Sequence, residues 1–288
     1  MEYILEILKA VLFGIVEGVT EWLPVSSTGH MILLDEFIKL KMSQDFYDMF
    51  EIVIQLGAIL AVIVLFFHKL NPFSVKKDAV QKKDCWQLWF KVVVAVIPSA
   101  VIGLLLDEEI DGFLRQTQIA GVTLNAIVVA LALILYGVAF MVVEKRAGQD
   151  LAVSDVGQIT YKTALLIGVF QCLSIIPGTS RSGSTILGAI LLGVSRSAGA
   201  EFSFFMASPT MLGASALKLL LFLKSGVAAS GLELTVLAVG CVVSFVVSLL
   251  VIKGLMEYVR KHTFSVFGVY RIVLGSLVIL YFIIKTLI

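Results

Sequence analysis

Six long runs of mainly apolar residues divide the sequence. They are Phe46–Phe67, Leu88–Leu106, Ile119–Val143, Phe202–Leu223, Leu232–Ile252 and Val266–Ile284. A helix needs about 20 mainly apolar residues to cross the hydrocarbon core of a bilayer, and each run is close to that length or longer. The pattern predicts six transmembrane helices.

Two further apolar segments are interrupted by polar residues and a proline. The first, at about residues 8–36, contains Glu17, Glu21 and Pro24, and the second, at about 163–193, contains Pro177. Proline has no N–H to donate and disfavours a helical conformation in the residue before it. We therefore expect each segment to form a re-entrant helical hairpin that returns to its own side of the membrane.

The two halves of the chain align as diverged copies. Gly168-Val-Phe-Gln171 matches Gly14-Ile-Val-Glu17, and Ser180-Arg-Ser-Gly183 matches Ser26-Ser-Thr-Gly29. Each half, 1–143 and 144–288, holds one hairpin followed by three crossings, and an odd number of crossings inverts the second copy. The sequence predicts one all-α integral membrane domain, 1–288, with an inverted-topology repeat whose hairpins meet at a polar cavity.

Composition agrees with a polytopic membrane protein. Hydrophobic residues make up 59% of the chain and charged residues 15%, which lies outside the range of soluble globular proteins. The three cysteines match no metal or redox spacing, and Glu2 and Glu6 precede the first lysine, so we expect no cleaved signal peptide. We expect membrane lipid as the main partner and no nucleic acid, and a homodimer remains open.

The charged residues between the runs orient the chain. Lys69, Lys76, Lys77, Lys82 and Lys83 crowd one short loop, which assigns that loop to the cytoplasm. We expect the acidic segment 107–111 to be a loop on the external side, so the first hairpin enters from outside.

Chemistry-bearing side chains concentrate in the two hairpins. Glu17 and Glu21 are four residues apart and share one helix face, before the polar loop 26–30, which ends in His30. The second hairpin has a Gly- and Ser-rich turn, 177–185, that leads into a helix and contains Arg181. Backbone N–H groups, the helix dipole and a guanidinium together are typical of a phosphate site.

Structural interpretations stand beside these. Glu17 and Glu21 would only pair with Arg181 as a buried structural lock, and the hydroxyls of Ser26, Thr28, Thr179 and Ser184 would only bond to backbone or stabilise packing between helices. Glu51 and Gln55 either face the cavity as secondary candidates or bond to neighbouring helices. We expect Arg271 to extend to the cytoplasmic interface, and His68 and His262 to be solvated without a role.

Residues 17–30, E-G-V-T-E-W-L-P-V-S-S-T-G-H, and 177–185, P-G-T-S-R-S-G-S-T, resemble the two signatures of the bacitracin-resistance-type undecaprenyl-diphosphate phosphatases. The resemblance extends over essentially the whole chain. It implies a phosphoric anhydride hydrolase of the bacterial inner membrane that converts the C55 diphosphate to the monophosphate, recycles the lipid carrier for cell-wall synthesis and confers bacitracin resistance. It also implies an active site that opens toward the periplasm.

The same resemblance assigns roles. Glu17 and Glu21 would hold a divalent cation, Mg²⁺ or Ca²⁺, Ser27 and His30 would be catalytic, and Arg181 would bind phosphate. Further phosphate-binding candidates in the two motifs are Ser26, Thr28, Gly178, Thr179, Ser180, Ser182, Gly183 and Thr185. We hypothesise that Ser27, activated by His30, attacks the terminal phosphate, with direct attack by His30 as the variant.

A transporter of prenyl phosphates is the alternative function, because inverted repeats around a central site are a transporter architecture. A transporter needs a binding site but no nucleophile beside a base. The presence of Ser27 and His30 near two carboxylates favours the enzyme.

Overall fold

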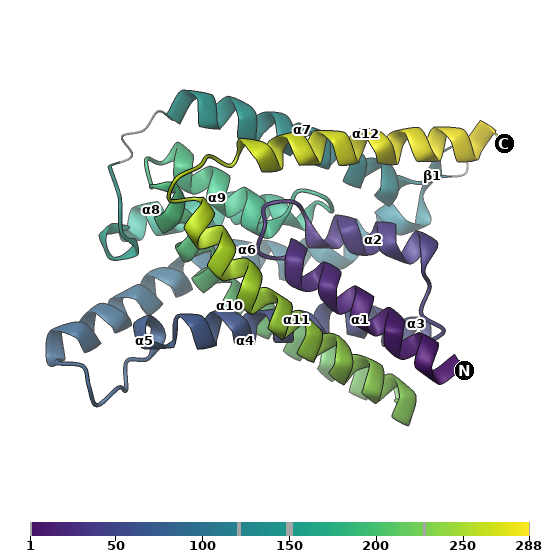
Figure 1. Cartoon of the computed structure of the whole chain (residues 1–288), viewed down its shortest axis with the longest axis horizontal. Coiled ribbons are helices and arrows are strands. Elements are labelled where there is room, and N and C mark those ends of the chain that lie inside the picture. The colour runs from purple at the N-terminus through teal and green to yellow at the C-terminus, as the bar shows by residue number, and fades with distance from the viewer. Residues whose placement is uncertain (1, 120–121, 148–151, 227–228, 288) are drawn as a thin grey trace.

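The computed structural model describes residues 2–119, 122–147, 152–226 and 229–287. Helices make up most of this part of the chain (Figure 1). Six stretches are long and apolar enough to cross a membrane: Gln44–Leu65, Ala79–Leu106, Leu124–Ala147, Arg196–Lys224, Gly231–Tyr258 and Ser265–Thr286. The predicted all-α integral membrane protein with six crossings is confirmed.

The first crossing consists of α3 (Gln44–Val53) and α4 (Gln55–Leu65), with a break at Ile54, and the short α5 (Phe67–Leu70) follows. The other five are α6 (Ala79–Gln116), α7 (Leu124–Ala147), α10 (Arg196–Lys224), α11 (Gly231–Tyr258) and α12 (Ser265–Leu287).

Two expected boundaries are wrong. The acidic segment 107–111 is not a loop, because α6 continues through it for a total of 38 residues. The crossing expected from Ile119 begins at Leu124, after the antiparallel pair β1 (Gln118–Ile119) and β2 (Val122–Thr123). Residues 120–121 lie outside the described residues. Hydropathy marks where a helix leaves the hydrocarbon, whereas a helix itself ends only where its backbone hydrogen bonds stop.

Both broken segments form hairpins. The first comprises α1 (Glu2–Thr20) and α2 (Ser27–Phe37), so it begins earlier than expected. The second follows the 3₁₀ turn η1 (Val156–Gln158) and comprises α8 (Tyr161–Gln171), the 3₁₀ turn η2 (Cys172–Ile175) and α9 (Arg181–Leu191). Each hairpin has a loop between two helices at the position of its proline.

The two hairpin loops have the same local geometry. Ser26 and Ser180 are the only described non-glycine residues with positive φ, at 74° and 73°. Each caps the following helix, because the Ser26 hydroxyl accepts from Gly29 N and the Ser180 hydroxyl from Gly183 N. Positive φ is strained for a side-chain-bearing residue and is often found at functional sites.

Each hairpin is held by a long helix of the other half of the chain. Helix α1 packs along α11, α8 packs along α6, and α7 lies against α12 (Figure 1). A Cβ atom added at Gly168 would lie 1.9 Å from the carbonyl oxygen of Ala95, and one at Gly57 would lie 2.1 Å from that of Cys241. Only glycine permits these close backbone approaches, which are typical of helix packing in membranes.

The tip of the first hairpin is anchored in the larger of two buried apolar clusters. Trp22 is fully buried there and packs edge to face on Phe204, with ring centroids 5.1 Å apart. Ile186 of the second hairpin belongs to the same cluster. The two tips are thus fixed against one core, which places their polar loops side by side.

Candidate active site

A cavity of about 340 Å³ lies between the two hairpin loops and extends along α3, α6 and α10. Its lining includes the chemistry-bearing residues Glu17, Glu21, Ser27 and Arg181. The predicted meeting of both hairpins at a polar cavity is therefore what the structure shows.

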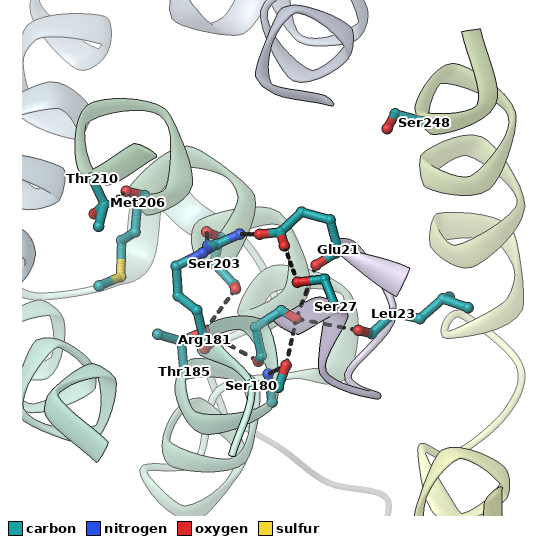
Figure 2. A network of polar contacts seen from close by, with 12 residues as sticks. Glu21, Leu23, Ser27, Ser180, Arg181, Thr185, Ser203, Met206, Thr210 and Ser248 are labelled. Carbon is teal, nitrogen blue, oxygen red and sulfur yellow. Dashed lines mark hydrogen bonds and ion pairs between the residues drawn. The ribbon is translucent and has the colours of Figure 1, made fainter. Parts of the chain in front are cut away.

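Three of these side chains form a direct chain of contacts (Figure 2). The Ser27 hydroxyl donates to Glu21 Oε2 over 2.5 Å, and Arg181 Nη2 donates to Glu21 Oε1 over 2.8 Å. Arg181 Nη1 donates to the carbonyl of Ser203 over 3.1 Å. Because Glu21 and Arg181 come from different hairpins and are both largely buried, this ion pair couples the two loops directly.

Arg181 keeps one polar atom unused. Its Nε is buried and has no hydrogen-bond partner among the described residues. Its guanidinium carbon lies 6.0 Å from the centre of the Trp22 ring. A buried N–H without an acceptor is costly, so this atom indicates a site that an anionic group would complete.

Glu17 is also incompletely satisfied. It lies on α1, one turn before Glu21, which directly follows that helix. Glu17 is 1% exposed, and its Oε1 has no hydrogen-bond partner in the described part of the chain. Glu51 and Gln55 line the same cavity, which is the first of the two alternatives for them. Tyr47 donates to Glu51 Oε1 over 3.1 Å.

The carboxylate oxygens of Glu17 and Glu21 suit a divalent cation that is also bound by substrate phosphates and water. The described residues contain no group of three or more His, Cys, Asp or Glu arranged to hold a metal. Mg²⁺, however, is commonly held by one or two carboxylates together with substrate phosphates and water. Glu17 has a free buried oxygen for this purpose, whereas both oxygens of Glu21 are engaged.

His30 does not contact Ser27 in this arrangement. Its Nδ1 lies 2.7 Å from the carbonyl of Ser26 and its Nε2 lies 2.7 Å from the Tyr270 hydroxyl. A carbonyl only accepts, so Nδ1 carries the proton, and in the neutral ring Nε2 accepts from Tyr270. The ring stacks on that of Tyr270 and is not part of the cavity lining. Ser27 is paired with Glu21 rather than with His30.

The expectation for Arg271 is wrong. Arg271 is fully buried rather than extended to an interface. Its Nη1 donates to Pro24 O over 2.9 Å, and its Nη2 donates to Gly178 O and Thr179 O over 2.7 and 2.9 Å. Its guanidinium also lies 5.1 Å from the centre of the Tyr136 ring. Arg271 thus links the backbones of both hairpin loops.

The proposed phosphate-binding residues divide into two groups. Those that line the cavity are Ser26, Thr28, Gly178, Ser180 and Ser182. The others, Thr179, Gly183 and Thr185, are bonded within the protein. Thr179 donates to the carbonyls of Leu173 and Ile176, Thr185 bonds to the Ser203 hydroxyl over 2.6 Å, and Gly183 N donates to Ser180.

Two hydroxyls of the second hairpin hold other elements in place. Ser182 Oγ lies within hydrogen-bond distance of the carbonyls of Glu21 and Leu23 in the first hairpin, and Ser184 bonds to the Tyr136 hydroxyl over 2.9 Å. The structural interpretation therefore describes the hydroxyls of Thr179 and Ser184.

In chemical terms, the Ser27 hydroxyl donates to the Glu21 carboxylate, and the same carboxylate accepts from the Arg181 guanidinium, which has one unused N–H. The first turn of α9 adjoins the cavity through Arg181 and Ser182, which adds the positive end of a helix dipole. The arrangement can bind an anionic phosphorus group next to a nucleophile that has its proton acceptor in place.

Comparison with known proteins shows similarity to one protein family over nearly the whole chain. A family model described as bacitracin resistance protein BacA matches residues 10–277. Undecaprenyl-diphosphatase 1 of Clostridioides difficile is 58% identical over 279 residues, which is 97% of this chain and 97% of that protein. The undecaprenyl-diphosphatase of Enterococcus faecalis is 57% identical over 279 residues (96% and 97%), and that of Lactiplantibacillus plantarum is 56% identical over 281 residues (96% and 98%). This chain, with both signature motifs at one membrane-embedded cavity, belongs to the bacitracin resistance protein BacA family.

Proposed function

We propose that this protein hydrolyses undecaprenyl diphosphate to undecaprenyl phosphate and inorganic phosphate, and so recycles the lipid carrier for cell-wall synthesis. The observation that carries this function is the contact chain from Ser27 through Glu21 to Arg181 inside a membrane protein. A hydroxyl that donates to a carboxylate has a proton acceptor beside it, which nucleophilic attack requires and a binding or transport site does not.

In the first step, Ser27 Oγ attacks the terminal phosphorus and its proton passes to Glu21. The incoming phosphate competes with Glu21 for Arg181, whose Nε is unused, and this competition frees the Glu21 carboxylate to act as a base. The bond from the terminal phosphorus to the bridging oxygen breaks, and the lipid leaves as its monophosphate.

In the second step, water attacks the phosphorus of the phosphoserine, its protons stay on the inorganic phosphate that is released, and Ser27 is restored. Glu21, which holds the proton from the first step, returns it to the serine oxygen as the phosphorus–oxygen bond breaks. Arg181 and the first turn of α9 stabilise the charge that develops on the phosphate oxygens in both steps. His30 acts as a positioning residue, because its ring fixes the carbonyl of Ser26 and bonds to Tyr270.

A divalent cation, Mg²⁺ or Ca²⁺, would be held by Glu17, with Glu21 beside it and the substrate phosphates completing the ligand set. When bound, it would neutralise phosphate charge and polarise the phosphorus–oxygen bond. The unpartnered buried oxygen of Glu17 supports this assignment.

Several features of the membrane setting belong to the same proposal. The chain lies in the bacterial inner membrane with its cavity open to the periplasm, the lysine-rich loop is cytoplasmic, and bacitracin resistance follows from removal of the diphosphate. The inverted repeat is supported by the exchanged packing of α1 on α11 and α8 on α6.

Phosphate release from a long-chain prenyl diphosphate tests the function, using purified protein in detergent with and without EDTA. The native protein should release phosphate in a metal-dependent manner, and Ser27→Ala, Glu21→Gln and Arg181→Ala should each lower the rate by at least about a hundredfold. Glu36→Gln, outside the cavity, is the matched control. Saturable lipid binding by folded native protein without any phosphate release would refute the enzyme and favour a transporter.

A further inference from the structure

Trp22 lies beside the reacting groups, and the mechanism above does not use it. It directly follows Glu21, is fully buried and belongs to the larger apolar cluster. Its indole N–H has no hydrogen-bond partner among the described residues. A phenylalanine or a leucine would fill this place without the cost of an unpaired N–H, so apolar packing alone does not account for an indole here.

The ring of Trp22 is held in one position. It packs edge to face on Phe204 of α10, with ring centroids 5.1 Å apart and an interplanar angle of 87°. The backbone on both sides of Trp22 is held by Ser182 of the second hairpin, whose Oγ lies 3.2 Å from the carbonyl oxygen of Glu21 and 3.3 Å from that of Leu23. The ring is thus fixed next to the second hairpin.

The group beside this ring is the guanidinium of Arg181, whose carbon lies 6.0 Å from the ring centre. The same guanidinium donates from Nη2 to Glu21 Oε1 and from Nη1 to the carbonyl of Ser203 (Figure 2). The Arg181 side chain is only 11% exposed, so water screens these contacts little. A cation this close to an aromatic ring is attracted by the ring quadrupole, more strongly for Trp than for Phe, and more strongly when water is excluded.

Substrate phosphate competes with only one of the three contacts of Arg181. The Glu21 carboxylate carries a negative charge, and in the proposed mechanism it gives up Arg181 to the incoming phosphate. The Ser203 carbonyl and the Trp22 ring carry no net charge and stay in place. The ring attracts the cation as a whole and requires no particular N–H, so it leaves the donors of Arg181 available to phosphate oxygens.

We propose that Trp22 is a positioning residue for Arg181, whose ring holds the guanidinium in place while its charged partner changes from the Glu21 carboxylate to the substrate phosphate. This inference rests on the proposed phosphatase function. Without the ring, Arg181 is still present but less well fixed, so both the affinity for phosphate and the rate of hydrolysis fall. The loss follows the strength of the attraction to the ring, from Trp through Phe to an aliphatic side chain.

A graded pair of variants tests the role of the ring. Trp22→Leu should lower kcat/KM for a prenyl diphosphate by about tenfold and raise the Kd for inorganic phosphate by about fivefold, whereas Trp22→Phe should lose no more than about threefold in either. Phe140→Leu is the matched control, because Phe140 is a fully buried ring of the same cluster and does not line the cavity. It should lower the unfolding midpoint and keep native kcat/KM. Equal losses in the Phe and Leu variants of Trp22, or native kcat/KM and phosphate affinity in folded Trp22→Leu, would overturn the proposal.

The indole emission of Trp22 gives a readout that a merely structural role would not move. The chain has three tryptophans, so Trp86→Phe and Trp89→Phe on α6, neither of which lines the cavity, leave Trp22 as the sole emitter. Inorganic phosphate should change this emission, because it neutralises the cation beside the ring, and Arg181→Met should remove the response.

Phosphate binding measured by calorimetry without a change in Trp22 emission would overturn the proposal, as would a response that persists in Arg181→Met. Failure of the phosphatase itself is a separate result. It would appear as no phosphate release by the native protein, and an emission response to phosphate that requires Arg181 would still support the contact.

Discussion

Replacement of Arg271 by lysine should weaken both the fold and the reaction, because this buried side chain holds the two hairpin loops together. Arg271 donates hydrogen bonds to three carbonyl oxygens from two separate nitrogens. Nη1 donates to Pro24, and Nη2 donates to Gly178 and Thr179. A lysine has one nitrogen and cannot occupy both places. At least one loop carbonyl would lose its charged partner.

The expected size follows from that lost contact. A hydrogen bond to a charged group contributes about 1.5–3 kcal/mol, so Arg271→Lys should lower the free energy of unfolding by about 2 kcal/mol. Arg271→Met would remove all three bonds and is expected to fail to fold. The loops carry Ser27 and Arg181, and a displacement of about 1 Å in a catalytic group costs on the order of a hundredfold in rate. We therefore expect Arg271→Lys to fold and to lose most of its kcat.

Two measurements on the same detergent preparation check this prediction: the unfolding midpoint and the rate of phosphate release at saturating prenyl diphosphate. Arg260→Lys, at an exposed position after α11, is the matched control and should change neither. Native kcat in Arg271→Lys would refute the role of Arg271 in positioning the loops. A lower midpoint with native kcat would leave Arg271 as a purely structural residue.

Three further outcomes are expected. Gly168→Ala should lower the unfolding midpoint strongly, since its Cβ would lie 1.9 Å from the Ala95 carbonyl oxygen, whereas Gly213→Ala, with no atom within 4 Å, should be neutral; equal midpoints would contradict the close packing of α8 on α6. Glu17→Gln should abolish the activation of phosphate release by Mg²⁺ in a metal titration, while the variant still binds the prenyl lipid. Unchanged metal dependence would exclude Glu17 as the ligand. Tyr270→Phe should lower kcat by about tenfold without changing its pH dependence, whereas a shifted pH profile would indicate that His30 titrates in the reaction.

The sequence predicts the crossings and hairpins well because hydropathy and proline act locally. Runs of apolar residues require burial in lipid, and Pro24 and Pro177 interrupt helices wherever they occur. The same local signals place Glu17 and Glu21 on one face of a helix, and they place Ser27 and Arg181 next to the loops of the two hairpins. The end of α6 was mispredicted because a helix continues past the hydrocarbon when its caps allow it, and the start of α7 because the apolar residues Ile119 and Val122 belong to strands β1 and β2.

Tertiary contacts account for what the sequence does not reveal. Nothing near Arg271 in the chain distinguishes a buried arginine from one that extends to the surface, since its partners are Pro24, 247 residues away, and the turn at Gly178. The pairing of Ser27 with Glu21 instead of His30 likewise depends on Tyr270, which comes from the last helix. One signal was available: an arginine in an apolar span of a membrane protein favours a buried partner.

The equivalence of the two loops explains how the chemistry is divided between them. Ser26 and Ser180 have nearly the same positive φ and cap the next helix in the same way, so the residue that follows each is presented at an equivalent place. In the first hairpin that residue is Ser27, and in the second it is Arg181. One backbone geometry thus delivers a nucleophile from one side and a phosphate-binding cation from the other, and Glu21 contacts both. Had both loops kept the same side chain, the cavity would hold two nucleophiles without a cation or two cations without a nucleophile, so divergence at this single pair of positions is what the reaction requires.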